Sequence, residues 1–128
     1  MNLNKMKEIA IALRPYRQIE KYFHVAFIVN KSAIRAIGWN DSRKTHPMVL
    51  NFPYKTHSRI HAEMSAFLKL KGQGQSAKGM TIVVLRLDSS NGLRNSKPCV
   101  GCEALIREAG FSKVWYSGND QKFHMYRI

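Results

Sequence analysis

The sequence predicts an α/β domain built around a mixed sheet. Runs rich in β-branched and aromatic residues, which favour strands, alternate with segments whose apolar residues recur at helical spacing. In order, the expected elements are helix, strand, strand, helix, strand, helix, strand and strand. Only residues 118–122 separate the last two strands, and parallel strands need a connection of about a dozen residues or more. The last two strands are therefore expected to run antiparallel.

The first expected element is a helix within residues 1–16. Its apolar residues recur at helical spacing: Met6, Ile9, Ala10 and Leu13. Asn2 or Asn4 can cap its start, and Pro15 is expected to end it. We expect this helix to pack on the sheet. The alternative is an arm that binds nucleic acid through its basic residues, Lys5, Lys7, Arg14 and Arg17.

Two strands are expected next, at residues 22–29 and 33–39. The turn-forming residues 30–32 between them predict a β-hairpin. The second strand ends in the sequence Gly-Trp-Asn, and the asparagine, Asn40, has an ordinary explanation as a turn residue.

A long basic loop is expected over residues 41–59. Loops of this length in a compact domain are usually functional or disordered. The loop mixes aromatic with basic residues: Arg43, Lys44, His46, Phe52, Tyr54, Lys55, His57 and Arg59. Such a mixture can stack bases and hold phosphates. The candidate substrate-binding residues in it are Arg43, Lys44, Phe52 and Tyr54. The alternative is that the two aromatic residues anchor the loop to the core.

The second half of the chain supplies two helices and three strands. Ser58 can cap a helix over residues 60–70, and the nearly continuous apolar run 80–87 predicts a central strand covered on both faces. The polar loop 88–97 lacks the pattern of a phosphate-binding loop. Pro98 suits the first position of a helix that runs to Gly110. Strands are then expected at residues 114–117 and 123–128.

Two short motifs carry the chemistry. His61-Ala62-Glu63 supplies an imidazole and a carboxylate, and Pro98-Cys99-Val100-Gly101-Cys102 supplies the two thiols of the chain. Thiols three residues apart lie on one face of a helix's first turn and can grip one ion. One histidine and two cysteines leave a tetrahedral zinc one open position, where a bound water has a pKa of roughly 7. Glu63 is a natural proton shuttle beside such a water.

H-x-E followed by P-C-x-x-C is the signature of zinc-dependent nucleoside and nucleobase deaminases. The sequence resembles that superfamily over about residues 23–115. The resemblance implies that His61, Cys99 and Cys102 bind one zinc and that Glu63 is the general acid and base. It also implies a three-layer α/β/α sandwich with a mixed five-stranded sheet and the zinc between two helix N-termini. His46 and His57 are expected to be loop histidines and not further ligands.

Two features of the sequence resemble different branches of the superfamily, so the branch stays open. The Gly-x-Asn element resembles tRNA adenosine and deoxycytidylate deaminases, in which the asparagine contacts the nucleoside, and this gives Asn40 a substrate-binding role. The antiparallel last strand instead resembles the cytidine deaminase and bacterial toxin branches. Relatives often self-associate, so the resemblance also leaves a homo-oligomer open.

Composition and charge narrow the class of protein and its partners. A chain of 128 residues is expected to form a single domain, and no apolar run approaches the roughly 18 residues of a membrane span. We find no signal peptide, and two thiols at this spacing suit a reducing compartment, so a cytoplasmic location is expected. The formal net charge of +13 favours contact with polyanions such as nucleic acid; the alternative is a merely solubilising surface.

The leading hypothesis is therefore a zinc-dependent hydrolytic deaminase that converts cytosine to uracil in single-stranded nucleic acid. The alternatives within this class are a deaminase of a free nucleoside or nucleotide and an adenosine deaminase of RNA. Two alternatives from other classes are a zinc-stabilised nucleic-acid-binding module without activity and a structural zinc protein. The presence of Glu63 argues against the first, and structural zinc more often has four protein ligands.

Overall fold

A computed structural model of the chain describes residues 1–41, 43 and 60–128. The main sheet has the strand order β2-β1-β3-β5-β6, and a short strand, β4, pairs with β3 outside this path. In chain order the elements are α1 (Leu3–Arg17), β1 (Phe23–Asn30), β2 (Ala33–Trp39), α3 (Ala62–Gly72), β3 (Thr81–Leu87), β4 (Leu93–Arg94), α4 (Val100–Ala109), β5 (Lys113–Ser117) and β6 (Phe123–Arg127).

The strand directions make the sheet mixed. β1 is antiparallel to both β2 and β3, β3 is parallel to β5, and β5 is antiparallel to β6. The hairpin between β1 and β2 turns at Lys31 and Ser32, whose φ angles of 51° and 67° lie in the left-handed region that a two-residue hairpin turn uses. The predicted hairpin and the predicted antiparallel last strand are both confirmed.

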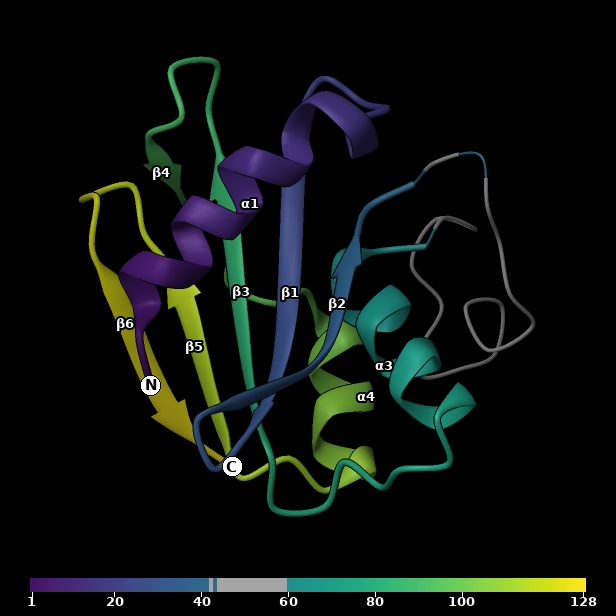
Figure 1. The fold of residues 1–128 in the computed structure, drawn as a ribbon. Helices are drawn as coiled ribbons and strands as arrows, with labels where there is room; N and C mark the ends of the chain where they lie inside the picture. Colours follow the sequence, from purple (N-terminus) through teal and green to yellow (C-terminus); the bar gives the residue numbers. More distant parts are fainter. Residues whose placement is uncertain (42, 44–59) are drawn as a thin grey trace.

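The sheet lies between two helical layers, as Figure 1 shows, with α1 on one face and α3 and α4 on the other. α1 buries Met6 and Ala10 against β1 and β3, so its predicted packing on the sheet is confirmed. β3 is covered on both faces, because Val83 points into the core under α1 while Val84 points into the core under the other two helices. This confirms the predicted α/β/α sandwich.

Helix α1 differs from its prediction at the C-terminal end. Asn2 caps the start, and its Oδ1 accepts a hydrogen bond from the Lys5 N–H at 3.0 Å. Pro15 does not end the helix as predicted but lies inside it, in the last turn. A proline there removes only its own N–H, and the chain still closes the turn through the Gln18 N–H, which donates to the Arg14 carbonyl at 3.0 Å. None of the described helices is both long and apolar enough to cross a membrane.

Three predicted details near the other helices are wrong. α3 begins at Ala62 with His61 as its N-cap, and not at residue 60 as predicted; Ile60 instead forms an extended bridge with Asp41. Pro98 precedes the N-cap of α4, which is Cys99, because the Cys99 thiol itself accepts a hydrogen bond from the Cys102 N–H. The loop after β3 contains the two-residue strand β4, which is too short to leave a sequence pattern.

Gly38 on β2 fixes how closely α3 lies on the sheet. A Cβ at this position would be 2.2 Å from the Ala66 nitrogen and 2.6 Å from the Ala62 oxygen. Both neighbours are backbone atoms of α3, so they cannot move away as a flexible side chain would. The glycine therefore allows the first two turns of α3, which carry Glu63 and follow the N-cap His61, to sit directly on the strand.

We expect Gly38→Ala to destabilise the fold by about 1–3 kcal/mol, the usual cost of overpacking a tight contact. The free energy of unfolding by urea measures this. Gly72→Ala is the matched control, because nothing lies within 4 Å of its position at the end of α3. Equal unfolding free energies for the Gly38 variant and the unchanged protein would contradict the proposed close contact.

Candidate active site

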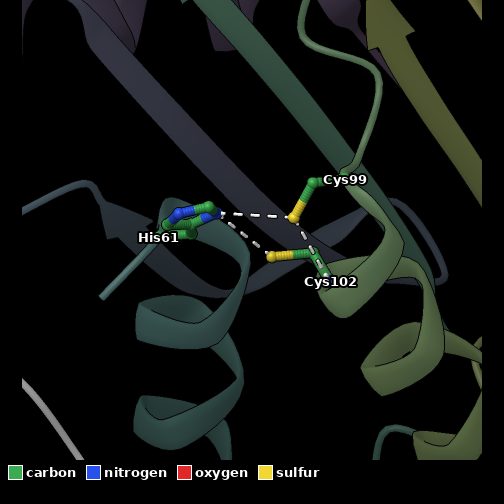
Figure 2. Close-up of side chains that lie close together, drawn as sticks. All are labelled: His61, Cys99 and Cys102. Carbon is green, nitrogen blue, oxygen red and sulfur yellow. Dashed lines mark hydrogen bonds between the residues drawn. The ribbon is translucent and has the colours of Figure 1, made fainter. Parts of the chain in front are cut away.

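The N-termini of α3 and α4 bring the three predicted zinc ligands together. Figure 2 shows His61 facing Cys99 and Cys102 across the gap between the two helices. The His61 Nδ1 lies 3.7 Å from the Cys99 Sγ and 3.5 Å from the Cys102 Sγ. The three donor atoms all lie within 4.8 Å of one another.

These separations fit a tetrahedral zinc. With Zn–S bonds of about 2.3 Å and Zn–N bonds of about 2.0–2.1 Å, a tetrahedral angle places sulfur and nitrogen about 3.6 Å apart. The two distances from the His61 Nδ1 straddle that value. Two thiols and an imidazole are also the donor set that zinc prefers, and three protein ligands leave a position for water or substrate.

A buried serine pair holds the segment that leads into Cys99. The Ser96 Oγ donates to the Val84 carbonyl at 2.8 Å and accepts from the Ser117 N–H at 2.8 Å. The Ser96 N–H donates to the Ser117 carbonyl at 2.9 Å. Both serines are nearly inaccessible to solvent. They tie this segment to β3 and β5 three residues before the first thiol.

The two thiols differ in acidity. A hydrogen bond from the Cys102 thiol lowers the pKa of Cys99 to about 4, and the His61 ring and the Cys102 N–H act in the same direction. The pKa of Cys102 is raised, because its proton is held by Cys99 and its sulfur is buried. The hydrogen bond to Cys99 also raises the pKa of His61. A helix N-terminus adds to the stabilisation of a thiolate, so one thiol is ready to bind a metal near neutral pH.

Glu63 lies in the first turn of α3, beside the ligands. Its side chain is buried, and burial raises its pKa to about 7, against the opposing effects of backbone N–H groups and the His61 ring. It also interacts with the Cys102 thiol. A carboxyl with a pKa near neutrality exchanges protons readily in both directions, which a general acid and base requires.

A pocket of about 170 Å³ opens beside the ligands. The described residues that line it are Glu20, Tyr22, His24, Asn40, Ile60, His61, Ala62 and Glu63. The sequence interpretation missed Glu20, Tyr22 and His24. The one available signal was a histidine within the otherwise apolar strand predicted at residues 22–29, whereas Glu20 and Tyr22, which precede β1, carry no such signal.

Asn40 lies in the wall of this pocket, and its amide is already engaged. Its Oδ1 accepts from the His24 N–H at 3.0 Å, and its Nδ2 donates to the Tyr22 carbonyl at 2.9 Å and to the Glu20 carboxylate at 2.6 Å. Both amide hydrogens are therefore used within the chain. Asn40 fixes the Glu20 carboxylate at the pocket, while its predicted substrate contact stays a prediction.

His24 is neutral at physiological pH. Burial lowers its pKa to about 4, and the positive charges of Arg86 and His61 act in the same direction, against a weaker opposite effect of Glu20. The neutral ring has one nitrogen that donates and one that accepts, so it can bind either kind of polar group in a ligand.

The predicted basic loop contributes one described residue. Arg43 is exposed and pairs with the buried Asp41 at 3.3 Å, and it is absent from the described lining of the pocket. The other predicted residues of the loop, Lys44, His46, Phe52, Tyr54, Lys55, His57, Ser58 and Arg59, lie outside the described residues. Their predicted roles stay predictions.

Comparison with known families agrees with this geometry. The sequence model of the family described as "Cytidine and deoxycytidylate deaminase zinc-binding region" matches residues 2–118. The chain belongs to this family. It is thus a zinc-dependent deaminase of the cytidine and deoxycytidylate type, with His61, Cys99 and Cys102 positioned to bind one zinc. No curated protein sequence gives a significant match.

Solved structures share the fold at low sequence identity. A cytidine deaminase from Mycobacterium leprae has a TM-score of 0.63 and 20% identity, covering 98% of this chain and 93% of that one. The dCMP deaminase from the cyanophage S-TIM5 in its apo form has a TM-score of 0.60 and 22% identity, covering 91% and 84%. Its complex with dCMP and dUMP has a TM-score of 0.58 and 20% identity, covering 91% and 82%.

We expect one zinc per chain in protein purified without chelators. Cys99→Ala and His61→Ala should each leave metal binding substoichiometric, because each removes one of three ligands. His124→Ala is the control, since His124 pairs with Asp120 on the β5–β6 hairpin. Metal content measured by mass spectrometry tests this. Full zinc occupancy in the Cys99 variant would overturn the ligand assignment.

Proposed function

We propose that this protein hydrolyses the exocyclic amino group of cytosine in a free nucleoside or nucleotide. The products are the corresponding uracil compound and ammonia. The observation that carries the proposal is the position of Glu63, a buried carboxyl with a pKa of about 7 beside a complete set of zinc ligands. A site of structural zinc has no need of such a proton carrier.

The reaction adds water to the ring carbon C4 and breaks its bond to the amino nitrogen. Zinc, when bound by His61, Cys99 and Cys102, lowers the pKa of water so that it can attack at neutral pH. Glu63 takes one proton from the water and delivers it to the ring nitrogen. The same carboxyl then transfers the second proton of the water to the amino group, which leaves as ammonia. Both transferred protons come from the water, so Glu63 ends the reaction in the protonation state in which it began.

Cytosine is the proposed base because the family is described by its cytidine and deoxycytidylate deaminases. The cyanophage relative was solved in complex with dCMP and dUMP, a nucleotide carrying cytosine and one carrying uracil. The Gly-x-Asn element that ends in Asn40 resembles both tRNA adenosine and deoxycytidylate deaminases, so it does not favour adenosine in RNA over cytosine. A zinc-stabilised binding module without activity would leave a buried Glu63 without a role.

The Glu20 carboxylate favours a small substrate over a polymer. Asn40 holds it at the pocket wall through a 2.6 Å hydrogen bond. A fixed carboxylate accepts hydrogen bonds from a sugar hydroxyl, but it repels a phosphate in the same place. A free nucleoside or 5′-mononucleotide offers its 3′-hydroxyl, whereas the interior of a DNA or RNA strand replaces this group with a phosphodiester; only RNA keeps another hydroxyl, at the 2′ position.

Single-stranded nucleic acid is the second candidate substrate. The formal net charge of +13 favours it, since such a surface attracts polyanions. Each phosphate contact on a single strand should contribute a slope of about −0.7 to the logarithmic salt dependence of binding.

Glu63→Gln should lower kcat by roughly 10²- to 10⁴-fold, because general acid–base catalysis typically contributes that much. Zinc content and the thermal unfolding midpoint should change little, since the amide keeps the shape of the side chain. Glu8→Gln is the control, because Glu8 is exposed on α1, on the opposite face of the sheet. A loss under about tenfold would mean that another group moves the protons.

Substrate preference separates the two candidates. We expect turnover of deoxycytidylate or deoxycytidine to exceed that of a cytosine in any single-stranded oligonucleotide, because of the Glu20 carboxylate. The measurement is kcat/KM for uracil formation on free compounds and on DNA and RNA oligonucleotides at several salt concentrations. Faster turnover of an oligonucleotide, with steep salt dependence, would instead establish the polymer as substrate.

A further inference from the structure

Arg86, near the end of β3, has a guanidinium without a hydrogen-bond acceptor among the described residues. Its side chain is half-buried, its Nε is inaccessible to solvent, and this nitrogen has no hydrogen-bond partner among the described residues. The guanidinium forms no ion pair within residues 1–41, 43 and 60–128. A buried donor left unpaired costs stability, so an unpartnered one in a native fold calls for an explanation.

Arg86 is not among the described residues that line the active-site pocket, but it neighbours two residues that are. Its guanidinium carbon lies 4.2 Å from the ring centroid of Tyr22, which lines the pocket. In the sheet register it stands directly opposite His24, another residue of the lining. Stacking on Tyr22 occupies the face of the guanidinium. The N–H groups point outward in its plane, so stacking fixes the cation; the buried Nε is closed to a ligand, and the two terminal nitrogens remain as donors.

The other neighbour in the sheet adds a second positive charge. Arg94 on β4 stands directly opposite Arg86 on β3. Like charges at directly opposite positions destabilise a sheet unless something compensates them. Arg94 is compensated by Asp88, at 3.1 Å. Glu20, which also lines the pocket, does not pair with Arg86; its carboxylate accepts a hydrogen bond from Asn40. Among the described residues, Arg86 therefore keeps a charge without an ion-pair partner next to Tyr22 and His24 of the pocket lining.

We propose that Arg86 binds the phosphate group of the nucleotide substrate whose base is deaminated at the zinc site. This inference rests on the proposed deaminase function and narrows its substrate class from nucleosides to nucleotides. A guanidinium matches phosphate well, since two parallel N–H groups can each donate to one phosphate oxygen. Glu20 then accepts a hydrogen bond from a sugar hydroxyl of the substrate, and Arg86 binds its phosphate.

The phosphate has two sources, a monoester on a free nucleotide and a diester in a strand. The chemistry at Arg86 is the same for both. Deoxycytidylate, deoxycytidine and a single-stranded oligonucleotide with one cytosine separate them as substrates. An Arg86-dependent preference for deoxycytidylate assigns the monoester, and one for the oligonucleotide assigns the diester.

The test compares Arg86→Gln and Arg86→Lys with the unchanged, zinc-loaded protein. For the unchanged protein we expect kcat/KM for deoxycytidylate to exceed that for deoxycytidine. In Arg86→Gln this preference should fall roughly ten- to hundredfold, the range for a charged hydrogen bond. Arg86→Lys should fall between the two, because it keeps the charge but loses the paired donors. Arg35→Gln, an exposed arginine on β2, is the control and should keep the preference.

A second measurement does not depend on catalysis. Calorimetric binding of deoxyuridylate and deoxyuridine, the expected products, measures the phosphate contribution even if no turnover is seen. The proposal predicts tighter binding of deoxyuridylate and loss of this difference in Arg86→Gln. Equal affinities in the unchanged protein, or a preference that survives in both Arg86 variants, would overturn it. Failure of deamination with an intact Arg86-dependent preference would instead overturn the proposed function alone. Unfolding midpoints show whether Arg86→Gln or Arg86→Lys is misfolded. If one of them is, the result for the other variant tests the proposal.

Discussion

The active site depends on two helix N-termini being held against the same end of the sheet. Each helix carries only part of the ligand set, so the tetrahedral spacing exists only while both keep their places. Gly38 sets α3 directly on β2, and the pair Ser96 and Ser117 fixes the approach to α4. A shift of a few tenths of an ångström in either helix would move His61 Nδ1 away from the sulfurs. The sheet is thus the part of the molecule that sets the geometry of the metal site.

The meeting of the two helix N-termini also brings together three acidic groups whose negative charges would be costly to bury. Two thiols and the Glu63 carboxyl meet in a partly buried space, where isolated negative charges are unfavourable. Without metal, the protons are shared: the pKa of Cys99 is low because Cys102 keeps its proton, and the pKa of Glu63 is about 7 because it is buried. Helix N-termini compensate part of the negative charge, and a divalent cation compensates more. The site is therefore complementary to a cation before one binds.

Much of the fold and of the metal site could be predicted from the sequence, for identifiable reasons. The apolar run of β3 predicted a central strand, the short final connection predicted an antiparallel last strand, and the paired motifs picked out the three residues that the structure positions to bind one metal ion. Pro15 misled because a proline in a last helical turn removes a single donor. His24 left one signal, a histidine in an apolar strand, but Glu20 and Tyr22 left none. These residues reach the pocket through the start of β1 and through hydrogen bonds to Asn40, far from both motifs in sequence. Contacts that a folded chain creates between distant segments leave no local pattern.

The strong positive charge of the protein and the character of its pocket act at different ranges. A net charge of +13 draws anions to the surface as a whole, and this long-range attraction carries no information about which anion fits. Close to the zinc ligands the described lining contains two carboxyl groups, Glu20 and Glu63, and a neutral His24. A polyanion attracted by the surface would meet a carboxylate at the pocket wall, whereas the proposed nucleotide substrate would place its single phosphate at Arg86 and its hydroxyl at Glu20. Recognition is then decided by the order of charges along a few ångströms of pocket wall, and net charge affects mainly how fast substrates arrive.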